Sequence, residues 1–406
     1  MPNRRAIEGR PYTGAVDRLE ELRDDLWNRW RDAYDRRVDL ADASHSGERT
    51  VYGGKPLFSL KQYTPNSFPA GGRILFIQPA GRNSFHLYRL NAMGRPVFTH
   101  ARHEVNDLDW QGFYCYTPDE VEYVEFCLQT NVVSDYARMT LHNGLPATYQ
   151  HIDISGGGSH IGQHTGRIAM DFIPQDSHFY WVDVEKYESS DGRIVSGKSL
   201  VEGNGLSAMR SSLAYSWSAN GKLERIVSTN QDGYECTIYA APTKTSMKEL
   251  AASLSEQIAA RAIEALQNAV LGAPLVAVEL SYRSVTDYLP IVIAATERDS
   301  VPSLVLITAI DPNQWINLKH GDFEPGMTEF VQRLSADERY DHAEKMLRHA
   351  ARLITSRAPG SLATSDSFVA FAIDWEFDGH ELPAILKECG ASLATLEKLK
   401  AKGWLD

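Results

Sequence analysis

Apolar and polar positions alternate over short distances through the first 240 residues of the chain and recur at helical spacing afterwards. In the first part, turn residues separate short apolar runs that are rich in aromatic and β-branched side chains. Such runs are typical of β-strands. They predict strands at residues 73–78, 85–90, 121–130, 168–173, 178–187, 213–217, 223–228 and 234–240. We therefore expect a β-rich module in this part of the chain.

One helix is expected before these strands, over residues 15–36. Its apolar residues recur at steps of three and four, at Leu19, Leu22, Leu26, Trp30 and Tyr34. This spacing places side chains on one face of a helix. We expect that face to pack on the β-rich module, with a dimer or partner contact as the alternative.

Glycine-containing turns connect several of the expected strands. Gly94, Gly192, Gly221 and Gly233 each end a short polar stretch between apolar runs. Asn-Gly and Asp-Gly pairs supply the positive φ that tight hairpins require. Residues 213–240 in particular predict a three-stranded antiparallel meander, which closes an N-terminal module of residues 1–243.

A second module is expected to begin with a capped helix. Ser246 and Glu249 have the spacing of a capping box, in which each side chain satisfies a backbone N–H at the start of a helix. An apolar stripe continues to about Leu271, and Gly272 and Pro274 follow it as a stop signal. This start and stop predict a helix that opens a domain of residues 244–406.

The rest of that domain alternates expected strands and helices. The strands are expected at 275–282, 289–296, 304–310 and 368–376, and the helices at 326–334, 336–355, 380–388 and 392–402. Short links between the first three strands favour antiparallel pairing, because parallel crossovers need a dozen or more residues. The chain as a whole is therefore expected to be α+β. An N-terminal helix and an antiparallel hairpin module precede a domain with a small antiparallel sheet and flanking helices.

Composition and charge narrow the range of partners. Of 406 residues, 43% are hydrophobic and 23% are charged, which is ordinary for a globular protein. The formal net charge of −12 disfavours binding to nucleic acid or to an anionic membrane surface. An acidic surface suits a basic protein partner, because complementary fields raise association rates. The oligomeric state stays open.

The spacing of the cysteines and the N-terminal residues indicate the cellular compartment. None of the four cysteines forms a CxxC pair, so zinc-ribbon and disulfide-scaffold classes are not expected. The first residues include arginines without an apolar segment behind them, and no window has the length and apolarity of a membrane span. A cytoplasmic protein with free thiols is expected.

Residues 149–166 contain the most unusual candidate for chemistry. His151, Asp153, His160 and His164 lie within fourteen positions, around a run of glycines. In a strand, His151 and Asp153 share a face, and histidine and carboxylate side chains are common metal ligands. The four residues form a candidate divalent-metal site; the alternative is a glycine-rich loop with solvated histidines and no cofactor.

A second candidate is acidic. Asp374, Glu376 and Asp378 alternate at the end of the strand expected at 368–376. Carboxylates on one face of a strand can bind a cation or a basic partner. The alternative is a charged strand end that prevents the pairing of further strands.

The aromatic hairpins that end in glycine turns, and the C-terminal run FVAFAIDWEFDGHELPAILKECGASLATLEKLKAKGWL, are similar to bacterial immunity proteins of polymorphic-toxin loci. The resemblance lies in the general pattern and transfers no binding residue. It implies a protein without enzymatic activity that masks a toxin domain, with carboxylates facing a basic cleft of the toxin.

Three hypotheses for function follow. The first is a protein-binding protein of this immunity type, with a basic partner. The second is a metal-dependent hydrolase in which a metal at His151, Asp153, His160 and His164 activates water. The third is a structural or scaffold subunit of a bacterial or phage assembly, for which the apolar face of the 15–36 helix is the support.

Overall fold

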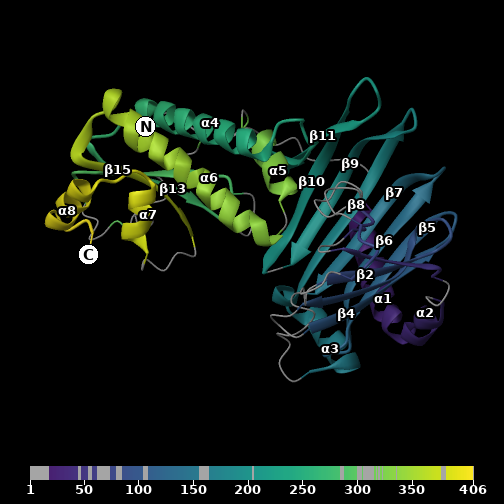
Figure 1. The fold of residues 1–406 in the computed structure, drawn as a ribbon. Coiled ribbons are helices and arrows are strands. Elements are labelled where there is room, and N and C mark those ends of the chain that lie inside the picture. The colour runs from purple at the N-terminus through teal and green to yellow at the C-terminus, as the bar shows by residue number, and fades with distance from the viewer. Residues whose placement is uncertain are drawn as a thin grey trace. The chain divides into compact units, whose positions relative to one another are not determined.

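The structure is a computed structural model. It describes residues 18–43, 47–53, 57–61, 74–78, 85–103, 108–154, 164–203, 205–283, 288–299, 304, 315–316, 318, 321, 323–334, 336–375 and 381–405. The fold is α+β, as expected (Figure 1). The described residues group into two compact units. The first unit holds those up to Tyr215 and Ser228–Tyr234, and the second holds Ser216–Val227 and those from Glu235 onward. The domain boundary at residue 243 stays a prediction.

A twelve-stranded meander dominates the β-rich part of the chain, since each strand is hydrogen-bonded to the strands before and after it. The pairs from β1 to β10 are antiparallel. The strands are β1 (Arg49–Gly53), β2 (Phe85–Leu90), β3 (Pro96–His103), β4 (Leu108–Tyr116), β5 (Glu120–Cys127), β6 (Val132–His142), β7 (Leu145–Ile154), β8 (Tyr180–Ser190), β9 (Arg193–Gly203), β10 (Leu206–Trp217), β11 (Leu223–Asn230) and β12 (Glu235–Ala240).

The hairpin turns form as the sequence predicts. Asp191 and Gly192 connect β8 and β9 with φ values of 53° and 75°, the positive values of a two-residue hairpin turn. Gly221 and Gly233 have φ values of 80° and 79° at the two turns of the 213–240 meander. The meander prediction is therefore confirmed.

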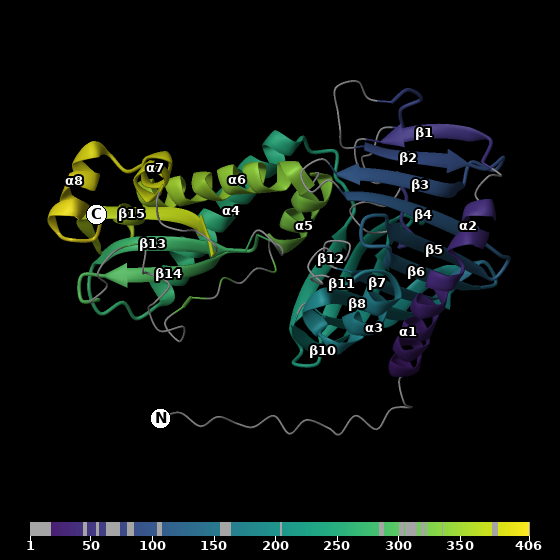
Figure 2. The same cartoon turned by 90° about the horizontal axis from the view of Figure 1, so that it is seen from below.

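Helix α1 (Leu19–Asp35) packs across β6, β7 and β8, and α2 (Arg37–Ala43) follows it (Figure 2). Leu26 and Trp30 are fully buried there. Polar contacts fix the position of the helix, because the Trp30 indole N–H donates to the carbonyl of Val133 at 3.0 Å. The Gln150 amide donates to the carbonyl of Leu22 at 2.6 Å. The expected packing of this helix on the β-rich module is confirmed.

The strand prediction at 168–173 is wrong, because these residues lie mostly in helix α3 (Gly166–Phe172), before the short 3₁₀ turns Ile173–Gln175 and Ser177–Phe179. Ala169, Met170 and Ile173 are fully buried together, and their spacing places them on one face of a helical turn. Within residues 74–78, Leu75 forms an isolated bridge to Tyr52 rather than a strand. The sequence prediction also omitted β1, β3, β4, β6, β7 and β9.

The capped helix predicted after residue 243 is present in the second unit. In α4 (Met247–Asn268), Ser246 accepts from the Glu249 backbone N–H, and the Glu249 side chain accepts from that of Ser246, which confirms the capping box. The other elements are α5 (Glu324–Arg333), α6 (Ala336–Arg357), a 3₁₀ turn (Ala358–Gly360), α7 (Leu382–Glu388) and α8 (Leu393–Ala401), with β13 (Leu275–Tyr282), β14 (Ile291–Thr296) and β15 (Thr364–Asp374). Residues 305–310, part of an expected strand, lie outside the described residues.

The small sheet has the order β14-β13-β15 and is mixed. β13 and β14 are antiparallel, as expected. β15 instead pairs parallel to β13. A parallel neighbour needs a long crossover, and the chain between β13 and β15 includes α5 and α6, of which α6 packs on β15. The expectation of a wholly antiparallel sheet is corrected in this respect.

Side chains of α5 cover the backbone of β12. The Gln332 amide donates to the carbonyl of Ile238 at 3.0 Å, and its oxygen accepts from the Ala240 N–H at 3.4 Å. The Thr328 hydroxyl donates to the carbonyl of Thr237 at 3.0 Å. These bonds satisfy groups that an edge strand would otherwise offer to a further strand.

Within the described part of the chain, no helix has the length and apolarity needed to cross a membrane. The cysteines are free thiols, and Cys127 and Cys389 are buried.

Candidate functional site

The strands β5 to β8 present two chemically different faces. Val124, Tyr136, Ile152 and Val182 share the face that packs with α1 in one apolar core. Because side chains alternate along a strand, the intervening residues point to the opposite face. Between β5 and β8 that face carries carboxylates, tyrosines and a histidine.

The sheet curls toward this polar face, which we call the inner face. The Leu57 N–H donates to the Tyr88 hydroxyl on β2 at 3.0 Å, and Lys61 bonds to Asp183 on β8 at 2.6 Å. A flat sheet would place β2 and β8 about 29 Å apart. The backbone from Leu57 to Lys61 spans at most about 14 Å, and the Lys61 side chain adds roughly 6 Å. The Tyr88 and Asp183 side chains stand roughly perpendicular to the sheet and add little along it, so the curl brings the two strands closer together.

Three carboxylates form one cross-strand row on the inner face. Glu125 on β5 is the register partner of Asp135 on β6, and Asp135 is in turn the partner of Asp153 on β7. Directly opposed like charges destabilise a sheet. The row, which we call the carboxylate row, is therefore costly unless protons or a cation reduce its charge.

Protons reduce this charge in the free protein. Burial, with a further contribution from Asp135, raises the pKa of Glu125 to about 8, although the hydroxyls of Tyr123 and Ser134 donate to this carboxylate at 2.6 and 3.2 Å. Desolvation and the charge of Asp135 raise the pKa of Asp153 to about 6. Glu125 is therefore protonated at neutral pH. The side chain of Asp153, by contrast, is still exposed to water.

His151 lies beside the row and is positively charged at neutral pH. Its Nε2 atom lies 3.2 Å from Asp135 Oδ1. Burial opposes the charge on the imidazole, but Asp135 and Asp153 more than offset it and raise the pKa of His151 to about 9.

A second group of inner-face carboxylates binds Lys61. The Lys61 ammonium donates to Asp183 Oδ2 at 2.6 Å and to Glu185, and it lies 5.2 Å from the centre of the Tyr149 ring. The Tyr187 hydroxyl also donates to Glu185, at 2.6 Å. Burial opposes the charge of Lys61, and the two carboxylates more than offset it, so its pKa is raised.

The structure brings together two of the four predicted metal ligands. His151 and Asp153 share the inner face of β7, as the strand pattern predicted. The His164 ring lies 5.2 Å from Phe172, which packs on the α1 side of the sheet, and His160 lies outside the described residues. No group of three metal-ligating side chains occurs among the residues that the structure describes. The four-residue metal site stays a prediction.

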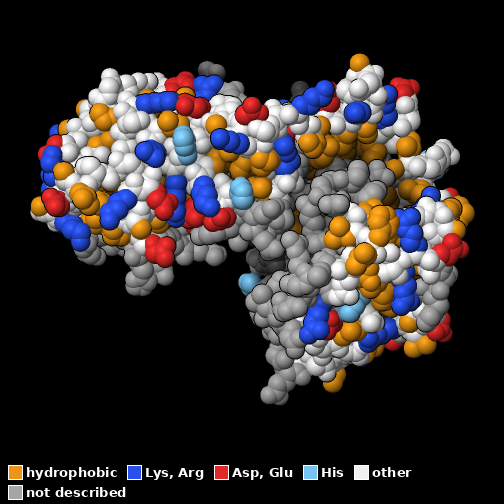
Figure 3. All heavy atoms as spheres, viewed as in Figure 1, with side chains coloured by type: hydrophobic (Ala, Val, Ile, Leu, Met, Phe, Trp, Pro, Cys, Tyr) orange, Lys and Arg blue, Asp and Glu red, His pale blue; other side chains and the backbone are white. Residues whose placement is uncertain are grey.

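Of the predicted acidic strand end, the structure describes Asp374. It is the last residue of β15, and only 8% of its surface is exposed. Arg283 lies over the neighbouring Trp375 ring at 4.1 Å. Glu376 and Asp378 lie outside the described residues. Figure 3 shows acidic and basic side chains intermixed over the helices of the second unit on the face in view. The proposal that this strand end binds a partner stays untested.

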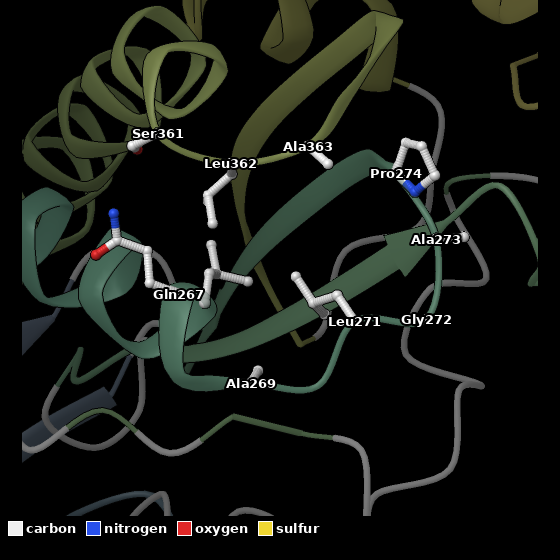
Figure 4. Close-up of a pocket in the computed structure, with 10 residues that line it drawn as sticks. Gln267, Ala269, Leu271, Gly272, Ala273, Pro274, Ser361, Leu362 and Ala363 are labelled. Atoms are coloured by element: carbon white, nitrogen blue, oxygen red, sulfur yellow. The ribbon is translucent and has the colours of Figure 1, made fainter.

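A pocket of about 390 Å³ lies in the second unit, between the end of α4 and the turn before β15 (Figure 4). Its lining is Leu266, Gln267, Ala269, Leu271, Gly272, Ala273, Pro274, Ser361, Leu362 and Ala363. This set has no titratable side chain, so the pocket offers apolar contact rather than acid–base chemistry. The inner face of the large sheet is the better candidate site, because its ionisable groups have strongly shifted pKa values.

Most residues of this site give no signal of their own in the sequence. Glu125, Asp135, Asp183, Glu185 and Lys61 were not singled out, because each is an ordinary charged residue in its local segment. A usable signal was present in β8, where Asp183 and Glu185 alternate with valines that face the core.

Comparisons with protein-family models, with curated proteins and with solved structures gave no match to this chain. The residues of the inner face are therefore the basis for inferring a function.

Proposed function

We propose that the protein is a binding protein whose inner face takes an ammonium group of a basic protein partner. The observation that carries this proposal is the carboxylate row, in which Glu125, Asp135 and Asp153 are direct cross-strand neighbours. A cation placed against the row removes a like-charge repulsion that the folded chain otherwise has to offset.

The charges around the row favour a cation over an anion. At neutral pH, protonated His151 lies 3.2 Å from Asp135, and Glu125 holds a proton that a bound cation would displace. Binding of a cation is therefore coupled to proton release and strengthens as the pH rises toward 8. Hydroxyls such as that of Tyr123 supply polar contacts around the charge.

A bound metal is supported less well by the same residues. Metal ions coordinate neutral imidazole, whereas the carboxylates beside His151 favour its charged form. The hydrolase hypothesis therefore requires a metal to displace this proton as well as the contact with Asp135. Metal analysis of protein purified without chelator tests that alternative.

The resemblance to immunity proteins supports a specific biological form of the proposal. Under it, the partner is a basic toxin domain in the cytoplasm, and an exposed lysine of that domain reaches the carboxylate row. Masking of the toxin would then depend on charge complementarity, which steers association and weakens as salt is added.

Calorimetric titration with a blocked trilysine peptide tests the proposal. We expect binding that weakens with salt and falls about tenfold or more in an Asp135→Asn/Asp153→Asn variant. Asp191→Asn, which changes a charge in the β8–β9 turn, is the matched control and should bind like the wild type. Equal binding by the double variant and the control would overturn the proposal.

A further inference from the structure

Lys61 already places an ammonium group against the inner face of the free protein. Its Nζ atom bonds to Asp183 and Glu185, and the Tyr149 ring lies beneath it at 5.2 Å. Two carboxylates and an aromatic face are the surroundings that bind an ammonium ion in proteins. The Lys61 side chain is 12% exposed, so the site encloses this group closely.

The segment that carries Lys61 is attached to the sheet at its other end. Leu57 is buried in an apolar cluster with Val51, Tyr88 and Leu90, and Phe58 packs against that cluster. Residues 57–61 belong to no helix or strand. Movement of the Lys61 side chain therefore does not require the Leu57 anchor or any hydrogen bond of the sheet to break.

One oxygen at this position is unsatisfied. Asp183 Oδ1 is shielded from water and has no hydrogen-bond partner, whereas Asp183 Oδ2 accepts from Lys61. A shielded carboxylate oxygen without a donor is costly. Lys61 therefore leaves part of the hydrogen-bonding capacity of Asp183 unused.

The geometry points to Asp183, Glu185 and Tyr149 as an ammonium subsite, which Lys61 occupies in the free protein and from which an ammonium group of the ligand displaces it. This inference rests on the proposed function, because it concerns the same inner face. His151 is the register partner of Asp183, so the subsite adjoins the carboxylate row. The exchange replaces one ammonium group by another and leaves the charge at the subsite unchanged.

Titration of Lys61→Met with the blocked trilysine peptide tests the inference. A competitor within the same chain lowers the apparent affinity for the peptide, because the peptide binds only during the fraction of time for which the site is free. Its removal should raise affinity about fivefold or more over the wild type. Lys186 lies at an exposed position on β8, the strand that carries Asp183 and Glu185. Lys186→Met removes the same charge as Lys61→Met and should give a much smaller gain in affinity.

Two further variants make the result interpretable. Lys61→Gln keeps a neutral donor near the carboxylates and should also bind more tightly, which covers the case in which Lys61→Met does not fold. Asp183→Asn in the Lys61→Met background should abolish the gain. If the wild type binds through Asp135 and Asp153 but neither Lys61 variant binds more tightly, the displacement is wrong and the proposed function stands. If none of these proteins binds the peptide, both are overturned.

Discussion

The aromatic ring of Tyr123 on β5 lies directly over Gly112 on β4. A Cβ atom at residue 112 would come within 2.6 Å of the Tyr123 ring carbon Cε2, closer than real Cβ contacts. The Tyr123 hydroxyl donates to Glu125 at 2.6 Å. The absence of a side chain at Gly112 therefore allows a hydrogen bond at the carboxylate row.

We expect Gly112→Ala to disturb this contact. The added methyl group should displace the Tyr123 ring and lower the free energy of unfolding by about 1–3 kcal/mol, the usual range for overpacking. Loss of the tyrosine donor should also raise the pKa of Glu125, because this hydrogen bond favours the ionised carboxylate. Urea unfolding measures the first effect, and NMR titration of the carboxyl measures the second.

Gly360→Ala is the matched control for this experiment. Nothing lies within 4 Å of a Cβ atom at residue 360, so its effect should stay within about 0.5 kcal/mol. Equal destabilisation by the two substitutions would contradict a specific contact between Gly112 and Tyr123.

Glu125→Gln should change how stability depends on pH. The folded protein holds the Glu125 proton up to about pH 8, whereas an unfolded chain releases it near 4.3. Ionisation of Glu125 therefore lowers the stability of the wild type as the pH rises through this window. The variant should be more stable than the wild type by roughly 1–2 kcal/mol at pH 9 and similar to it at pH 4. Denaturant titrations at these pH values check this, and parallel pH profiles would refute it.

Glu279 in the second unit should show a similar dependence for a different reason. It lies in the central strand β13 and is fully buried. Neither carboxylate oxygen has a partner within hydrogen-bond geometry, although the nearby Ser281 hydroxyl lowers the pKa of Glu279 in part. Its register partners, Ile293 and Phe371, are apolar. Burial raises the pKa of Glu279 to about 8, so its ionisation opposes folding increasingly between about pH 4 and pH 8.

Replacement of Glu279 by an apolar side chain of similar length removes the free-energy cost of this buried carboxylate. Glu279→Met should stabilise the protein by roughly 2–4 kcal/mol at pH 9 and by less at pH 5, as measured by chemical unfolding. Glu397→Met, at an exposed position on α8, should have little effect at either pH. An equal gain at pH 5 and pH 9 would show that the Glu279 charge is not the cause.

Local signals in the sequence were sufficient for the elements that local interactions determine. The capping box of Ser246 and Glu249 fixes the start of α4, and the strand predicted at 275–282 matches β13 at both ends. The error at α3 arose because seven residues with mixed apolar side chains do not separate a helical period from a strand period.

The inner-face site could not be predicted in this way. Glu125, Asp135 and Asp153 become neighbours only through the register of β5, β6 and β7. That register includes a shift between Glu125 and Phe126. A displacement of one residue would move each carboxylate to the opposite face. Hairpin length and bulge position are therefore needed before these charges can be recognised as one site.

The extent of the second folding unit gives a final prediction. Fragment 244–406 should be less stable than fragment 216–406, although both contain α4 to α8. In the longer fragment, Glu329 of α5 accepts from the backbone N–H and the hydroxyl of Thr243 at 2.7 and 2.9 Å, and Gln332 bonds to β12.

Removal of residues 216–243 takes the Thr243 and β12 partners from Glu329 and Gln332, although Glu329 keeps its ion pair with Arg333 at 3.0 Å. Each lost hydrogen bond should cost about 0.5–1.5 kcal/mol. We expect a lower urea midpoint for fragment 244–406 and faster amide exchange in α5, with α7 and α8 unaffected. The substitution Glu329→Ala in fragment 216–406 should reproduce part of this loss, because it leaves the Thr243 N–H unpaired. Equal midpoints for the two fragments would instead support a boundary at residue 243, with β12 contributing nothing to the stability of the C-terminal helices.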